Sequence, residues 1–257
     1  PVRILANDRP PGLPGSRNCG ATAAQAPVLG FCDDDDLWLP GHLVPHIELL
    51  EARPDLHAVL GQVITTDHEG TAISDPWPTV IPADGELYQS FLADYPQIGA
   101  TVVRTKVRET VGLLDEDLLS DEDWDWHLRL ARAGKIGFVP VPSVLFRQRA
   151  PGTFDRLQWM RVGYMRRVLV RSLLRSGRHR PGPGHTVRIL LHHHRMYYTS
   201  FVESATRHLA HGDRGAMWRA IGYATAASPI HAVLGAQYTP LKPSAERVAG
   251  GRGTHCW

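Results

Sequence analysis

Short apolar runs separated by turn residues alternate with amphipathic patterns over residues 1–150. Five of these runs predict strands: 2–6, 28–32, 58–65, 99–103 and 136–139. Helical spacing of apolar residues occurs at 43–52 and 124–133, and the second pattern ends at Gly134, a typical residue just after a helix. Ser16 is expected to cap a further helix that continues to Ala26. This alternation of strands and helices predicts an α/β sheet.

The pattern changes after Pro151, where longer helical repeats replace the short strands. Three helices are predicted there: 155–176, 187–210 and 213–228. The residues from Pro240 onward are rich in Pro, Gly, Ser and Arg, which predicts a flexible tail. We therefore expect an α/β domain at residues 1–150 and a helical C-terminal extension at residues 151–257.

The two predicted regions carry opposite charge. Residues 1–150 hold 22 acidic and 12 basic side chains, and residues 151–257 hold 4 acidic and 16 basic ones. The acidic region is not expected to bind nucleic acid, because contact with phosphates requires clustered cations. Its carboxylates would be neutralised by a metal ion. The basic region is expected either to dock on the acidic one or to face anionic lipid or phosphate.

Cysteine usage and hydropathy predict a soluble, cytoplasmic protein. The three cysteines include no C-x-x-C pair, which disfavours a disulfide framework and a structural zinc site. No signal sequence is recognised at the start of the sequence. The longest uncharged stretch, 220–241, is interrupted by two prolines and is a poor membrane span. Peripheral contact with the inner face of the membrane through the basic helices is the alternative location.

Four aspartates, Asp33 to Asp36, directly follow the predicted strand at 28–32 and precede an aromatic and apolar segment at 37–40. Adjacent carboxylates repel one another, so a bound cation would offset the repulsion. Ligands of open α/β sheets gather where strands end, and carboxylate oxygens suit Mg²⁺ or Mn²⁺. A solvated acidic loop is the alternative.

A second acidic cluster, 120–125, begins the helix at 124–133, where it provides either favourable charge at a helix N-terminus or a general base.

Several segments, taken in order, resemble the family-2 glycosyltransferases of GT-A fold. The first two of these motifs are Gly15-Ser-Arg-Asn-Cys-Gly20 and Gly30-Phe-Cys-Asp-Asp-Asp-Asp-Leu-Trp-Leu-Pro40. The second pair is Val111-Gly-Leu-Leu-Asp-Glu-Asp-Leu118 and Glu122-Asp-Trp-Asp125, followed by matching segments at 128–134 and 139–147. The resemblance covers residues 1–150 and implies a metal-dependent enzyme that moves a sugar from a nucleotide-sugar to an acceptor hydroxyl.

The resemblance also implies roles for individual residues. Asp33 is expected to contact the ribose side of the donor, and Asp35 to bind the divalent metal, Mn²⁺ or Mg²⁺, with Asp36 beside it. The remaining residues expected in the nucleotide-sugar pocket are Asp34, Arg17, Asn18 and Arg147, with a surface position that caps the fold as the alternative for Arg17. Asp123 is the expected base that removes the proton of the acceptor, Glu122 is the neighbouring alternative, and the single displacement inverts the anomeric configuration. The acceptor, whether a glycan, a lipid-linked molecule or a small molecule, is not specified.

Two departures from the family leave alternatives open. The sequence starts at what resembles the third strand of the family, without the usual strand-helix-strand unit. It is therefore interpreted as a fragment, a mis-assigned start or a non-catalytic homologue that acts as a binding subunit.

The Q-x-x-R-W motif of processive synthases is absent, which favours transfer of a single sugar. A sugar nucleotidyltransferase is a further alternative, although residues 12–20 fit its Gly-rich phosphate loop poorly.

Other features have structural interpretations. His192 to His194 are expected on a helix surface, because consecutive helical residues point in different directions. Packing against the acidic region or solvation is favoured over lipid contact for four arginines: Arg166, Arg167, Arg171 and Arg175. Cys32 is expected to be a core thiol, and Trp38 to pack beneath the four aspartates.

Overall fold

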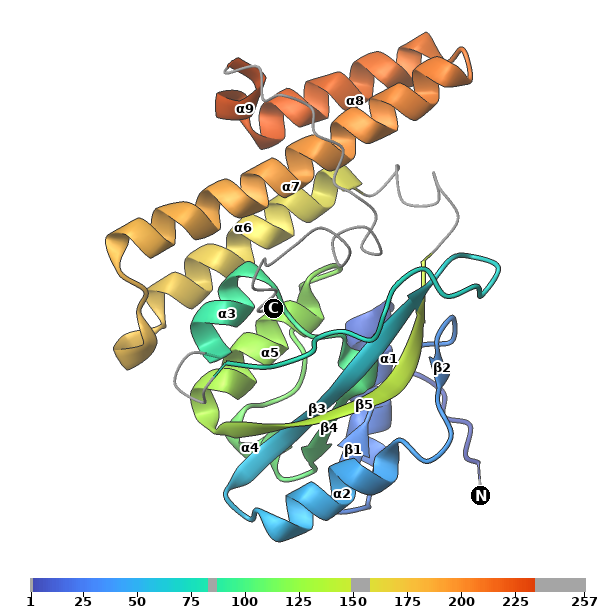
Figure 1. The fold of residues 1–257 in the computed structure, drawn as a ribbon, viewed down its shortest axis with the longest axis vertical. Coiled ribbons are helices and arrows are strands. Elements are labelled where there is room, and N and C mark those ends of the chain that lie inside the picture. The colour runs from blue at the N-terminus through green and yellow to red at the C-terminus, as the bar shows by residue number, and fades with distance from the viewer. Residues whose placement is uncertain (1, 83–86, 149–157, 234–257) are drawn as a thin grey trace.

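A five-stranded mixed sheet forms the centre of the N-terminal half of the protein (Figure 1). The computed structural model describes residues 2–82, 87–148 and 158–233. The strand order is β1-β4-β3-β5-β2, and the strands are β1 Val28–Gly30, β2 Leu37–Trp38, β3 Leu56–Thr66, β4 Thr101–Arg104 and β5 Lys135–Arg147. The long strands β3 and β5 pair in parallel, with Val59 opposite Gly137. Strand β4 is antiparallel to both β1 and β3, and β2 is antiparallel to β5.

Helices cover both faces of this sheet. Those of the N-terminal half are α1 Leu13–Ala23, α2 Leu43–Ala52, α3 Leu87–Ala93, α4 Val107–Thr110 and α5 Glu122–Ala133, with a 3₁₀ turn η1 at Ile98–Ala100. The later elements are α6 Gln158–Leu174, the 3₁₀ turn η2 Gly177–His179, α7 Pro183–Ala210, α8 Arg214–Ala227 and α9 Pro229–Val233. Helix α2 packs on one face, and α3 and α5 lie between the other face and helices α6 and α7 (Figure 1).

The main apolar core lies between the sheet and the later helices. Its largest side chains include Trp124 of α5 and Phe91 of α3, both fully buried. Met165 and Val168 of α6 belong to the same cluster. A smaller cluster beneath α2 contains Leu50 and Val59 among others. Because α5 is buried between the sheet and α6, the acidic residues at its N-terminus are held by the core.

Most of the predicted elements are confirmed. The helix at 43–52 and the third helix of the C-terminal region have the predicted bounds within a residue. Asp213 caps α8 by accepting a hydrogen bond from the amide of Ala216 at 2.9 Å. The α/β class with a helical C-terminal region is therefore confirmed, while the division into two domains at residue 150 stays a prediction. Within the described ranges, no helix combines the length and apolar character needed to cross a bilayer.

Two predictions near the N-terminus are wrong. Residues 2–6 form no strand, and Val2 and Ile4 are 95% and 96% exposed. Helix α1 starts at Leu13 with Gly12 at the N-cap, not at Ser16, since proline at position 14 is tolerated in a first helical turn. The helix ends at Ala23, and residue 26 is non-helical because it precedes Pro27.

The other differences concern the ends of elements and single side chains. Strand β5 extends eight residues beyond the predicted 139, through Pro140 and Pro142. His193 is buried, contrary to the predicted surface position of the three histidines, because its helix face packs on Trp124 with ring centroids 4.7 Å apart. Residues 155–157 of a predicted helix and the predicted flexible tail from Pro240 lie outside the described residues.

Candidate active site

Three of the four aspartates after β1 form a compact acidic cluster. One carboxylate oxygen each of Asp33, Asp35 and Asp36 lies within 4.8 Å of the others, and the three side chains are half-buried. Asp34 is exposed and outside this group. Hard oxygen donors at this separation fit Mg²⁺ or Mn²⁺, so the chemistry of the donor set agrees with the predicted metal.

Asp36 is tied to the end of strand β5. Its Oδ1 accepts a hydrogen bond from the backbone amide of Arg147 at 2.9 Å. Burial, together with the charges of Asp33 and Asp35, raises the pKa of Asp36 to about 6 against the opposing effect of Arg147. Arg147 thus contributes its amide here, while its side chain is exposed.

Trp38 packs against Gly30 of β1 and Gly99 of η1, and its predicted position beneath the four aspartates stays a prediction. Its indole Nε1 donates to the carbonyl of Gly99 at 2.8 Å. The ring also closes over Gly30, where a Cβ would lie 3.2 Å from the indole carbons. Cys32, by contrast, is exposed rather than in the core, because β1 ends at Gly30 and the chain has already turned outward.

Arg17 of α1 joins the two acidic motifs. Its Nη2 contacts both carboxylate oxygens of Asp33 at 2.7 Å, and its Nη1 contacts Glu122 Oε1 at 2.6 Å. The side chain of Arg17 is only 9% exposed, so these charge-assisted bonds are shielded from water. The cluster after β1 and the pair that begins α5 therefore meet at one guanidinium.

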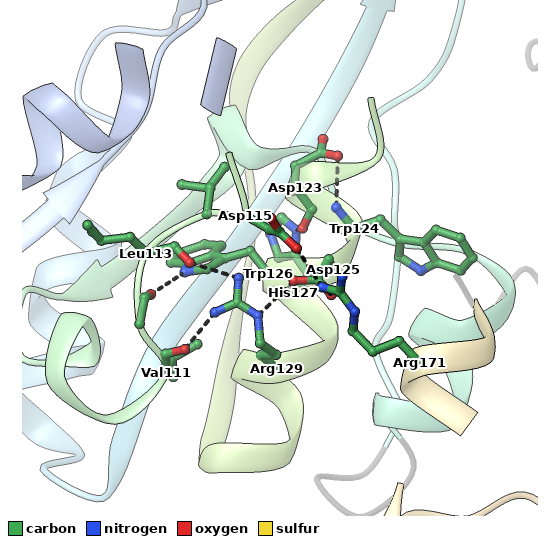
Figure 2. Close-up of polar contacts among 12 residues, drawn as sticks. Val111, Leu113, Asp115, Asp123, Trp124, Asp125, Trp126, His127, Arg129 and Arg171 are labelled. Atoms are coloured by element: carbon green, nitrogen blue, oxygen red, sulfur yellow. Dashed lines mark hydrogen bonds and ion pairs between the residues drawn. The ribbon is translucent and has the colours of Figure 1, made fainter. Parts of the chain in front are cut away.

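Glu122 and Asp123 differ in their hydrogen-bond partners. Burial and the charge of Asp123 raise the pKa of Glu122 to about 7, although Arg17 opposes the shift. Burial also raises the pKa of Asp123. Asp123 Oδ1 accepts from the amide of Trp124 at 2.8 Å (Figure 2), and its Oδ2 has no hydrogen-bond partner among the described residues. Glu122 is thus bonded by a cation, whereas the hydrogen bond to Asp123 comes from a backbone amide.

Asn18 lies apart from the acidic cluster. Its amide nitrogen donates to Leu114 O at 2.9 Å and Glu116 Oε1 at 2.8 Å, and its oxygen accepts from Leu114 N at 3.0 Å. The side chain of Asn18 is therefore committed to holding the turn at 114–116 against α1. In this way it orients the helix that carries Arg17.

An ion-pair network around the buried Asp125, which the sequence analysis missed, supports α5 from behind. Asp125 accepts from Arg129 Nε at 2.8 Å and lies 3.5 Å from Nη1 of Arg171, which also bonds Asp115 at 2.6 Å. Figure 2 shows Arg129 reaching from Asp125 to the carbonyls of Val111 and Leu113, at 2.6 and 2.9 Å. The signal in the sequence was the spacing of four residues between Asp125 and Arg129 on one helix.

The four arginines at 166–175, three in α6 and Arg175 just after its end, have different surroundings. Arg171 and Arg167 pair with Asp115 and Asp117 of the acidic region, which confirms the packing interpretation for these two. Arg166 donates to carbonyls at the end of α8. Arg175 is exposed. Lipid contact through this face stays a prediction.

Residues 1–92 match the family model described as Glycosyl transferase family 2. The N-terminal part of the chain is thus related to the family-2 glycosyltransferases, which confirms the resemblance seen in its motifs. Together with the mixed sheet and its helical layers, the match confirms the GT-A-like fold class.

Two curated relatives are themselves described as uncharacterized glycosyltransferases. YwdF of Bacillus subtilis (strain 168) is 25% identical over 154 residues, which cover 57% of this chain and 54% of the relative. A protein of Haemophilus influenzae (strain ATCC 51907 / DSM 11121 / KW20 / Rd) is 27% identical over 133 residues, or 51% of this chain and 44% of the relative. The chain thus matches about half the length of each of these relatives.

Among solved structures, the fold has a partial likeness to S. aureus TarS. A crystal structure of TarS 1-349 gives a TM-score of 0.41 at 12% identity, covering 82% of this chain and 70% of that one. The same fragment in complex with UDP gives a TM-score of 0.41 at 14% identity, covering 89% and 72%.

Proposed function

We propose that this chain is the catalytic part of an inverting glycosyltransferase that moves a single sugar from a nucleotide-sugar to an acceptor hydroxyl. The observation that carries the proposal is the bridge formed by Arg17. It holds a carboxylate of the acidic cluster and a carboxylate of the α5 pair on one guanidinium. Groups suited to a donor diphosphate and a group suited to an acceptor proton therefore lie in one site.

The donor side consists of the acidic cluster and its neighbours. Asp35 and Asp36 would hold Mn²⁺ or Mg²⁺, since both oxygens of Asp33 are bonded by Arg17. A bound divalent ion supplies a Lewis acid for the negative charge of the leaving diphosphate. Asp33 is assigned to the ribose side of the donor. Asp34, Arg17 and Arg147 complete the proposed pocket, and Asn18 supports it through the position of α1.

Asp123 is proposed as the base. Its Oδ2 takes the proton of the acceptor hydroxyl while the acceptor oxygen bonds to the anomeric carbon and the bond from that carbon to the nucleoside diphosphate breaks. A single displacement of this kind inverts the configuration. The raised pKa of Asp123 makes its carboxylate a stronger base. Glu122 is the less suitable neighbour, because its carboxylate is bonded by the cationic Arg17, whereas Asp123 is bonded by a neutral backbone amide.

The test measures donor binding and transfer separately. A panel of nucleotide-sugars, with and without Mn²⁺, is assayed for binding by calorimetry and for transfer or donor hydrolysis by release of nucleoside diphosphate. Asp35→Ala should abolish metal-dependent donor binding, whereas Asp123→Asn should retain binding and lose turnover. Asp75→Asn, at an exposed aspartate outside the proposed pocket, is the control for both variants.

Three outcomes would contradict the proposal. Wild-type activity of both Asp35→Ala and Asp123→Asn would show that Asp35 does not bind the metal and that Asp123 is not the base. Absence of binding to every nucleotide-sugar would favour a non-catalytic binding subunit. Release of pyrophosphate from a nucleoside triphosphate and a sugar phosphate would favour a sugar nucleotidyltransferase. A hydroxyl acceptor panel of glycans, lipid-linked sugars and small alcohols then identifies the acceptor class.

A further inference from the structure

The turn that begins α5 has an unusual backbone. Asp121, the residue immediately before Glu122, has φ 61°, and it is the single non-glycine residue with positive φ within 2–82, 87–148 and 158–233. Left-handed backbone is unfavourable for a residue with a side chain, so surrounding contacts must hold it. The carboxylate of Asp121 is also buried, with 4% of its side chain exposed. Two costly features therefore coincide two residues before Asp123.

Arg161 supplies the contacts at this turn. It comes from α6, which packs along α5 (Figure 1). Its Nε donates to Ser120 Oγ at 3.0 Å, and Ser120 Oγ donates to Asp121 Oδ2 at 3.1 Å. Its Nη2 lies 3.8 Å from Asp121 Oδ1. Arg161 thus reaches the turn by a direct ion pair and through one hydroxyl.

The other neighbour of Asp123 is fixed independently. The indole Nε1 of Trp124 donates to the carbonyl of Phe91, and the ring stacks on Tyr95 at a centroid distance of 5.6 Å. Core packing therefore fixes the chain after Asp123. The chain before it is held by Arg17 at Glu122 and by Arg161 at the left-handed residue Asp121.

We propose that Arg161 is a positioning residue for Asp123. It holds the left-handed turn at Asp121 and so sets the direction in which the Asp123 carboxylate meets the acceptor. The proposal rests on the proposed function, in which Asp123 is the base. Because the match to the family model ends at residue 92, this role is assigned from contacts alone.

Charge is the second effect of Arg161 on Asp123. The groups that act electrostatically on Asp123 include Glu122, Asp121, Arg17, Asp33, Arg161, Tyr95 and Tyr197. Arg161 and Arg17 favour the ionised carboxylate, and the acidic neighbours disfavour it. Loss of Arg161 should therefore move the acidic limb of the kcat profile to higher pH.

The activity test compares four proteins: wild type, Arg161→Ala, Arg161→Lys and Arg175→Ala. A misplaced base lowers turnover but does not weaken binding of the donor. Arg161→Ala should therefore reduce kcat about 100-fold with an unchanged donor KM. Arg161→Lys should recover part of kcat, and the exposed Arg175, one residue beyond the end of α6, is the control. An Arg161→Ala enzyme with wild-type kcat and pH profile, or one that loses only donor affinity, would overturn the proposal.

A double-mutant cycle tests the route through Asp121. Asp121→Asn removes the charge, and asparagine still tolerates the left-handed backbone. If Arg161 acts through this turn, the kcat losses of Arg161→Ala and Asp121→Asn should not multiply in the double variant. Fully multiplicative losses would show that Arg161 acts elsewhere.

Hydrogen exchange provides a readout that does not need activity. Arg161→Ala should accelerate amide exchange in a peptide covering 120–124, whereas exchange in α2 should match wild type. Unchanged exchange at 120–124 would overturn the positioning role even in an active enzyme. If wild type transfers no sugar from any donor, the proposed function fails, and faster exchange would still establish that Arg161 fixes this turn.

Discussion

The guanidinium of Arg17 bonds Asp33 at 2.7 Å and Glu122 at 2.6 Å, although Glu122 lies 105 residues further along the chain. All three side chains are mostly shielded from solvent. Removing one partner of such a bridge leaves the others with uncompensated charge. The bridge therefore contributes to stability as well as to the shape of the site.

Arg17→Ala should lower the free energy of unfolding at pH 8 by about 3 kcal/mol. The loss should be smaller at pH 6, because Glu122, with a pKa of about 7, then takes up a proton and loses its buried charge. Urea denaturation at both pH values measures the difference. Adding Glu122→Gln to Arg17→Ala should recover part of the loss at pH 8. An equal loss at both pH values would show that Glu122 is not the affected group.

Metal affinity should depend on the protonation of Asp36. Its pKa of about 6 means that protons compete with a cation as the pH falls through 6, so Mn²⁺ binding should weaken there. Asp36→Asn should lower Mn²⁺ affinity by at least about tenfold and flatten the pH dependence. Electron paramagnetic resonance of free Mn²⁺ measures both quantities. Asp75→Asn, at an exposed aspartate outside the proposed pocket, should behave as wild type, and equal weakening in that control would argue against a site at Asp36.

Two aspartates each have two basic partners, and the buried one should contribute more to the free energy of unfolding than the exposed one. Asp125 is 3% exposed and contacts Arg129 and Arg171, whereas Asp55 is 43% exposed and contacts Arg53 and Lys135. Asp125→Ala should cost about 3 kcal/mol. Asp55→Ala should cost far less, because solvent screens its ion pairs. Chemical denaturation of the two variants tests this, and similar losses would contradict it.

His193 should make the fold sensitive to acid. Its Nε2 donates to Leu92 O at 2.6 Å, its Nδ1 is buried without a partner in the described structure, and burial lowers its pKa to about 4. The unfolded chain takes up a proton near pH 6.5. The stability present above pH 6.5 is therefore lost as the pH falls towards 4, by about 2 kcal/mol between pH 7 and pH 5.

His193→Gln should reduce the stability lost between pH 7 and pH 5 by about 2 kcal/mol, because the glutamine amide still donates to Leu92 O but does not titrate. The buried His127, whose pKa is lowered to about 3, keeps the remaining sensitivity to acid. The free energy of unfolding is measured by urea denaturation at pH 7 and pH 5. His68→Gln, in an exposed loop, is the control and should lose as much stability as wild type. A His193→Gln protein with the wild-type difference between the two pH values would show that another group is responsible.

Local pattern was enough to predict the elements and the motifs of this protein. The apolar spacing at 43–52 and the aspartate at the start of α8 act within one or two helical turns, so their effect is visible in the sequence. The run Asp33 to Asp36 after an apolar strand indicated an acidic cluster for the same reason. The strand predicted at 2–6 was wrong because a strand also needs a neighbour to pair with, which no local pattern supplies.

Tertiary structure alone decided which charges meet and which side chains are buried. Arg17 lies between Asp33 and Glu122, Arg161 reaches the turn before Asp123, and His193 packs on Trp124. Each of these contacts joins segments that are far apart in the chain and come together only when the sheet and helices pack. Because pKa values and buried ion pairs depend on such surroundings, the sequence named the candidate residues and the packing assigned their partners.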